Sequence, residues 1–114
     1  MNAPPSYVVN AVARASPGFW GAWQSAVGAA YRSAGGFSVT SWWRSPEYNE
    51  QVGGADGSQH LLGVAFDAQA RDLNRLEASL RGAGFRTIRY ATHVHAQPWP
   101  AGVASPLLRS LGWS

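Results

Sequence analysis

The sequence contains no cysteine and no lysine. Without cysteine the chain can form neither structural disulfides nor thiolate metal sites. Its nine basic residues are scattered arginines, and a net charge of +3 without a basic run gives little support for a nucleic-acid partner. No apolar stretch is long enough to span a membrane, and no basic start followed by an apolar run marks a secretory signal. We therefore expect no nucleic-acid partner, no membrane partner and no signal peptide.

Length and composition bound the number of domains. A chain of 114 residues can form one domain with a single core, and 46% hydrophobic and 13% charged residues are typical of a globular protein. The six tryptophans favour core filling over a ligand platform, because large rings bury much area per residue. Residues 1–15 carry two prolines among mixed small residues and indicate an extended arm. We expect an N-terminal arm at 1–15 and one domain at 16–114.

Periodicity and turn signals predict an α+β fold. Ser16 and Pro17 suit a helix start, and a glycine pair at 35–36 suits its end. Residues 44–63 are polar and rich in glycine, which is typical of a long functional loop. We expect a small, mainly antiparallel sheet flanked by helices, with helices at 16–34, 72 to 82 or 84, and 105–111, and strands at 37–43, 64–69, 85–90 and 92–96.

Three histidines and one aspartate carry the strongest chemical signal. His60 lies late in the polar loop, and Asp67 follows it within an expected strand. His93 and His95 are two apart on another expected strand, a spacing that directs both imidazoles to the same side of a sheet. Two imidazoles and one carboxylate are the ligand set of a catalytic zinc, whose fourth position stays open for water. By spacing alone, these residues are also compatible with ordinary structural or surface roles.

The stretch from Thr40 to Asp67, TSWWRSPEYNEQVGGADGSQHLLGVAFD, is the most specific motif in the chain. It has the pattern S-x-x-R-S, a glycine-rich turn, and then S-x-H-x-x-G-x-A-x-D, and a late THVHA follows at 92–96. This pattern resembles the zinc D-Ala-D-Ala carboxypeptidase and L-alanyl-D-glutamate endopeptidase family, which includes the vancomycin-resistance D,D-peptidases and the zinc site of hedgehog signalling domains. The signature is most similar to the small bacterial and phage branch. The resemblance covers residues 37–96, about half of the chain.

The resemblance implies a zinc site on the sheet with His60 and Asp67 as two of the ligands. In the bacterial and phage branch the late strand usually reads His-x-Asp and its histidine binds the metal, so we expect His93 to be the third ligand. In the hedgehog branch the strand reads His-x-His and the second histidine binds the metal. That alternative makes His95 the third ligand.

The resemblance also implies roles around the metal. Arg44 is expected to face the substrate and to clasp a carboxylate or stabilise an oxyanion, the alternative being a structural salt bridge. Ser58 is expected either to hydrogen-bond the substrate or to fix its loop. Active members keep an acid near the last histidine as general base, but no acid lies between Leu80 and the end of this chain. We therefore expect His95 to be the base, because imidazole exchanges protons near neutral pH.

Together these residues predict a zinc metallopeptidase that hydrolyses peptide bonds of the D,D or L,D type in peptidoglycan stem peptides. The alternative is a catalytically degenerate domain that is a structural or wall-binding component of a phage particle, because the usual acidic base is missing. The expected partners are a peptidoglycan peptide and other virion proteins. The expected location is a phage particle, or the host cytoplasm before lysis, with action on the cell wall.

Overall fold

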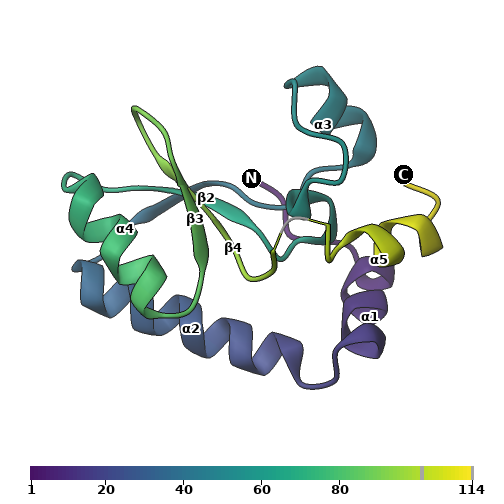
Figure 1. Cartoon of the computed structure of the whole chain (residues 1–114), viewed down its shortest axis with the longest axis horizontal. Helices are drawn as coiled ribbons and strands as arrows, with labels where there is room; N and C mark the ends of the chain where they lie inside the picture. Colours follow the sequence, from purple (N-terminus) through teal and green to yellow (C-terminus); the bar gives the residue numbers. More distant parts are fainter. Residues whose placement is uncertain (101, 114) are drawn as a thin grey trace.

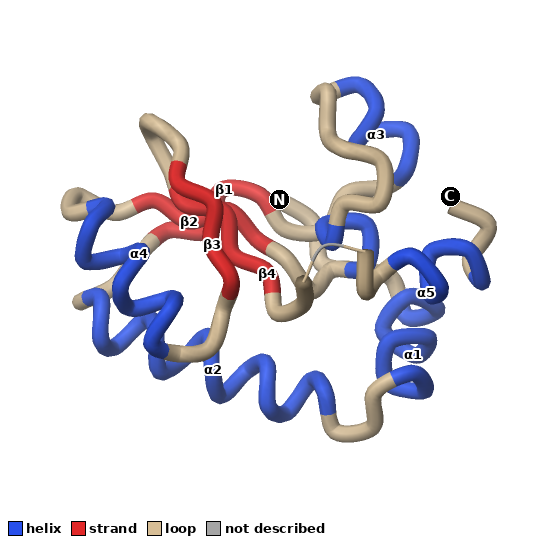
Figure 2. The backbone as a smooth tube through the Cα atoms, viewed as in Figure 1, coloured by secondary structure: helices blue, strands red, loops and turns tan. Residues whose placement is uncertain are grey.

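The computed structural model describes residues 1–100 and 102–113, and it confirms the α+β fold class. These residues form five α-helices, one 3-10 helix and one four-stranded antiparallel sheet. Figure 1 and Figure 2 show α2 and α4 beside the sheet and α1, α3 and α5 at the other end of the molecule. The elements are α1 (Ser6–Ala15), α2 (Phe19–Ala34), β1 (Ser38–Ser41), α3 (Pro46–Gln51), the 3-10 helix η1 (Gln59–Leu62), β2 (Phe66–Gln69), α4 (Leu73–Gly82), β3 (Arg86–Arg89), β4 (Val94–Gln97) and α5 (Ser105–Ser110).

The sheet has the strand order β1-β2-β4-β3, and every neighbouring pair is antiparallel. In the central pair β2·β4, Asp67 lies directly opposite His95, and Ala68 lies opposite Val94. Side chains alternate between the two faces of a strand. Asp67 and His95 therefore share one face of the two central strands, and their apolar neighbours occupy the other.

Helices α2 and α4 cover the apolar face of the sheet (Figure 1). Phe66 and Ala68 from β2 and Val94 and Ala96 from β4 are fully buried there. Leu76 and Leu80 of α4, Ala30 of α2 and Phe85 complete the same cluster. Because α2 and α4 both pack on the apolar face, they leave the face that carries Asp67 and His95 available for a site.

A second apolar cluster joins the two ends of the chain. Val12 of α1 packs with Leu61, Leu62 and Val64 around η1 and with Leu108 of α5. The expected arm at 1–15 is therefore largely a helix packed on the body of the protein, with Val8 and Val12 fully buried. Spacings of three and four residues between Val8, Ala11 and Val12 form a helical stripe. The two prolines precede the helix, with Pro5 at its N-cap, and so do not interrupt it.

Tryptophan side chains hold the segment that connects His60 to Asp67. The indole N–H groups of Trp43, Trp42 and Trp23 donate to the carbonyl oxygens of Leu61 (2.8 Å), Gly63 (2.7 Å) and Val64 (2.9 Å), respectively. A buried backbone carbonyl needs such a donor, and this segment has irregular backbone that no neighbouring strand pairs. The tryptophans therefore fix the path of the chain between two site residues as well as filling space.

The long loop predicted at 44–63 contains two short helices. Ser45 accepts a hydrogen bond from the backbone N–H of Tyr48, and Pro46 occupies the first turn, which explains why α3 begins there. Figure 1 shows α3 extending away from the sheet. Among the described helices, none combines the length and the apolar character that crossing a membrane requires.

Candidate metal centre

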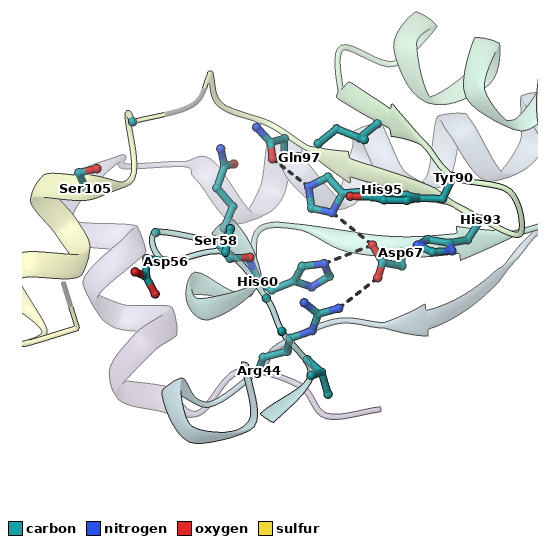
Figure 3. A pocket seen from close by; sticks show the side chains of 18 residues that line it. Arg44, Asp56, Ser58, His60, Asp67, Tyr90, His93, His95, Gln97 and Ser105 are labelled. Atoms are coloured by element: carbon teal, nitrogen blue, oxygen red, sulfur yellow. Dashed lines mark hydrogen bonds and ion pairs between the residues drawn. The ribbon is translucent and has the colours of Figure 1, made fainter. Parts of the chain in front are cut away.

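Three buried side chains from three separate elements meet on the open face of the sheet. They are His60 from η1, Asp67 from β2 and His95 from β4, with exposures of 2%, 7% and 8%. Nε2 of His60 and Nδ1 of His95 each lie 3.2 Å from the same oxygen, Oδ1 of Asp67 (Figure 3). One ligand atom from each residue lies within 4.8 Å of the other two, so the three can hold a single metal ion.

Local structure positions each of the three residues. The side chain of Ser58 accepts a hydrogen bond from the backbone N–H of His60 (3.2 Å) and caps η1. Gly63 ends η1 with φ +70°, and a Cβ there would collide with Pro4. Asp67 and His95 are brought together by the register of the central strand pair. The glycine in the sequence motif is therefore required by backbone conformation and by close packing.

In each imidazole, the nitrogen that points away from Asp67 has its own hydrogen-bond partner. If that nitrogen carries the hydrogen of the neutral ring, the nitrogen that points toward Asp67 has a lone pair. Nδ1 of His60 lies 2.6 Å from the carbonyl oxygen of Trp42, and Nε2 of His95 lies 2.8 Å from Oε1 of Gln97. The side-chain amide of Gln97 donates to Trp99 (2.9 Å), which leaves its oxygen to accept from His95. Neutral imidazole carries one N–H, and here each ring uses that hydrogen outward.

Two nitrogen lone pairs and one carboxylate oxygen therefore converge on one small volume. Zinc ligands bound at about 2.0–2.2 Å in a tetrahedron lie roughly 3.3 Å apart, close to the observed 3.2 Å separations. An outward hydrogen bond from each ligating histidine to a carbonyl oxygen is the usual support of a metal site. The donor set and its surroundings thus fit zinc.

The ionisation of Asp67 suits a metal ligand. In the protein without metal, burial by itself raises the pKa of this carboxyl, but hydrogen bonds and positive charge from His60 and His95, which each ring supplies when it carries a second, inward N–H, outweigh burial and hold the pKa well below its usual range. Nη2 of Arg44 lies 3.3 Å from Oδ2 of Asp67, so the second carboxylate oxygen also faces a cation. Asp67 consequently stays ionised over the physiological pH range.

Arg44 has a partner at each nitrogen of its guanidinium. Besides Asp67, it contacts Oγ of Ser41 through Nε (3.2 Å) and approaches Oδ1 of Asn49 through Nη1 (3.5 Å). Asn49 is 4% exposed, and its amide donates to the carbonyl oxygen of Ala55 (3.1 Å). Arg44 thus links Asp67, a ligand of the candidate centre, to the loop that follows α3 through Asn49. These contacts correspond to the structural salt bridge, the alternative role that the sequence left open for Arg44.

His93, which we expected to be the third ligand, lies outside the ligand group, and His95, which we expected to be the base, lies within it. Its ring stacks on Tyr90 with 4.6 Å between centroids, and its Nδ1 lies 3.1 Å from Oγ1 of Thr92. The strand begins only at Val94, and Asp67 pairs with His95. Residues two apart on a strand are separated by about 6.7 Å, so only the histidine opposite Asp67 joins the cluster. Both nitrogens of His95 are engaged, Nδ1 with Asp67 and Nε2 with Gln97, whereas His93 contacts neither Asp67 nor His60 among the described hydrogen bonds.

The cluster opens into a cavity of about 710 Å³. One wall is the loop from Val52 to Ser58, and the opposite wall carries Ile88, Tyr90 and His93 from the hairpin β3–β4. Ser58 and Arg44 also line this space. Every residue predicted for the site therefore borders one cavity, although His93 and His95 occupy different places in it (Figure 3).

A comparison with protein families matches residues 20–97 to the family described as Peptidase M15. The chain belongs to the Peptidase M15 family. The matched region includes all the site residues described above and extends from α2 to the end of β4. M15 peptidases are zinc-dependent, and the His60, Asp67 and His95 cluster is intact in this member. No curated protein and no solved structure gives a significant match to the chain.

Sequence reasoning missed two residues that support the M15 site. Gln97 stands two residues after His95, the same offset at which the bacterial branch has Asp after its ligand histidine, so aligning His95 with that ligand would have identified it. Asn49 lies in the middle of the motif, and nothing in its residue type distinguishes it from an exposed loop residue. Only its burial and its contact with Arg44 reveal its position.

Proposed function

We propose that this protein is a zinc-dependent peptidase that hydrolyses peptide bonds in the stem peptides of bacterial peptidoglycan. The observation that carries the proposal is the convergence of the inward lone pairs of His60 and His95 on the ionised carboxylate of Asp67, at the floor of an open cavity. Such an arrangement attracts a cation and leaves one side of it accessible to substrate.

We propose His60, Asp67 and His95 as the ligands, with the third position assigned to His95 on the strength of the β2·β4 register. Zinc held there supplies Lewis acidity for the peptide carbonyl and makes an attacking water acidic enough to react near neutral pH. Gln97 and the carbonyl of Trp42 orient the two imidazoles. Arg44 holds Asp67 and, because it also lines the cavity, offers positive charge near a developing oxyanion.

Proton transfer requires a group that borders the cavity without binding the metal. His93 meets both conditions, since it lines the cavity and lies outside the ligand cluster. We therefore propose His93 as general base in place of His95. The hydroxyl of Ser58 accepts from the backbone of His60 and keeps its own hydrogen, which is free for a substrate carbonyl.

One observation favours the second candidate, a degenerate domain that binds cell wall or builds a phage particle. Active members of the family that the motif resembles keep an acid near the last histidine, whereas Thr92 and the other neighbours of His95 in this sequence are not acidic. Among the described residues that line the cavity, the acids are Asp56 and the ligand Asp67. A metal site without a working base would still bind peptide and stabilise the fold.

Release of peptides from purified peptidoglycan distinguishes these candidates. We expect zinc-loaded protein to release stem fragments, and chelated protein and His60→Ala to release none. His93→Ala should retain zinc and lose most of its turnover, whereas Tyr90→Phe is a matched change on the same cavity wall that should retain both. Zinc binding without any release at mildly acidic, neutral and mildly alkaline pH would refute the peptidase and leave the degenerate domain.

A further inference from the structure

The charges that border the cavity are unequally available to a substrate. Arg44 is the single lysine or arginine among the described lining residues. Each of its guanidinium nitrogens already faces an acceptor on Ser41, Asn49 or Asp67. These contacts use three of the five N–H donors of Arg44, and the ionised carboxylate of Asp67 offsets its charge at 3.3 Å, so Arg44 attracts a substrate carboxylate less than an unpaired guanidinium would.

The free charge in the cavity is negative. Asp56 lies on the loop between α3 and η1, is exposed, and has no hydrogen bond or ion pair with any residue that the structure describes. In the view of Figure 3, Asp56 and His93 lie on opposite sides of His60, so the acid borders the end of the cavity away from the hairpin. A peptide that crosses the metal centre thus meets an unpaired carboxylate at one end.

We propose that the cavity accepts an internal peptide bond and favours a substrate segment with a positively charged group facing Asp56, and that it does not recognise the free carboxylate of a C-terminal residue. This inference rests on the proposed function and names its substrate class. A carboxypeptidase site needs a fixed cation for the terminal carboxylate. In this cavity the one arginine is already paired with Asp67, and the free carboxylate of Asp56 repels an anionic chain end.

Matched peptides test this selectivity by binding as well as by turnover. The reference is a short neutral peptide with a C-terminal amide. The second peptide has the same sequence but a free carboxylate on the residue after the target bond. Two further amidated peptides carry a lysine, one before and one after that bond. Affinities are measured by NMR titration of zinc-loaded and of zinc-free protein. The zinc-free series excludes direct contact between the carboxylate and the metal.

We expect one lysine peptide to bind about two- to fivefold more tightly than the neutral amide, the range typical of an exposed ion pair. Asp56→Asn should remove this gain. Glu50→Gln should keep it, because Glu50 is exposed on α3 and does not line the cavity. The free acid should bind no more tightly than the amide.

Two outcomes would overturn the inference: a free acid that binds about tenfold or more tightly than the amide in zinc-free protein, or no binding of any peptide. Cleavage is scored separately. If the peptides bind in the expected order and none is cut, the proposed peptidase activity is refuted and the proposed substrate selectivity is supported. If the peptide with the free carboxylate is the preferred substrate, the peptidase activity is supported and the proposed selectivity is refuted.

Discussion

Replacing His95 by alanine should remove most of the stabilisation of this protein by zinc, whereas replacing His93 should not. The two histidines are two residues apart, yet only His95 lies 3.2 Å from Asp67. His93 stacks instead on Tyr90 at the edge of the cavity. The pair therefore provides a ligand variant and a control of identical chemistry in the same segment.

The size of the effect follows from sharing the binding energy among ligands. Four-ligand zinc sites release about 10–16 kcal/mol, or roughly 3–4 kcal/mol per ligand, so loss of one ligand lowers affinity about 10²- to 10³-fold. At free zinc of about 1,000 times the dissociation constant, the wild type gains about 4 kcal/mol. His95→Ala at the same zinc level retains about 0.4–1.4 kcal/mol.

Thermal unfolding with and without zinc measures this difference. At about 4 °C per kcal/mol for a domain of this size, zinc should raise the Tm of wild type and His93→Ala by about 16 °C and that of His95→Ala by about 2–6 °C. Each shift is taken relative to the same variant without metal, so loss of packing at position 95 cancels. A full zinc shift in His95→Ala together with its loss in His93→Ala would refute the assignment.

Three further predictions concern the surroundings of the centre. Gln97→Leu should lower zinc affinity about 10- to 100-fold in a chelator competition assay, and Gln97→Glu should restore it, because an acceptor for the outward N–H returns. Gly54→Ala should lower the Tm, because the added Cβ collides with Asn49, whereas Gly21→Ala in the open interior of α2 should raise it by removing a helical glycine. Without zinc, the depressed pKa of Asp67 stabilises the fold above the ordinary pKa of an aspartate and loses that contribution as pH falls toward the folded-state pKa. Urea titrations should therefore show Asp67→Asn less stable than wild type at neutral pH, with the gap closing in strong acid.

The fold class and two members of the cluster were predictable because local signals carry them. Asp72 caps α4 through its side chain as its residue type suggests, and a glycine in the left-handed region ends α2. His60 and Asp67 belong to one continuous motif, so their proximity does not depend on distant contacts. His60 lies in the 3-10 helix and Asp67 in β2, and only residues 61–66 separate them.

The roles of His93 and His95 were not predictable from spacing, because strand register decides them. Both histidines fit one face of a strand, and only the pairing of Asp67 with His95 selects one of them. The helix at Ser6–Ala15 was missed for a different reason. Two prolines dominate the local signal, while the valine stripe behind them gains its stability from packing on distant residues such as Leu62 and Leu108.

The two histidines of the cluster differ in what guarantees their orientation. His60 is oriented by a main-chain carbonyl, that of Trp42, which any residue at that position would supply as long as the chain keeps its path. His95 is oriented by the side chain of Gln97, which one substitution can delete. The outer hydrogen bond of His60 therefore does not need a particular side-chain acceptor. The outer hydrogen bond of His95 depends on one side chain, that of Gln97. Substitutions at this position during evolution can therefore change the metal affinity of the proposed centre while the fold stays intact.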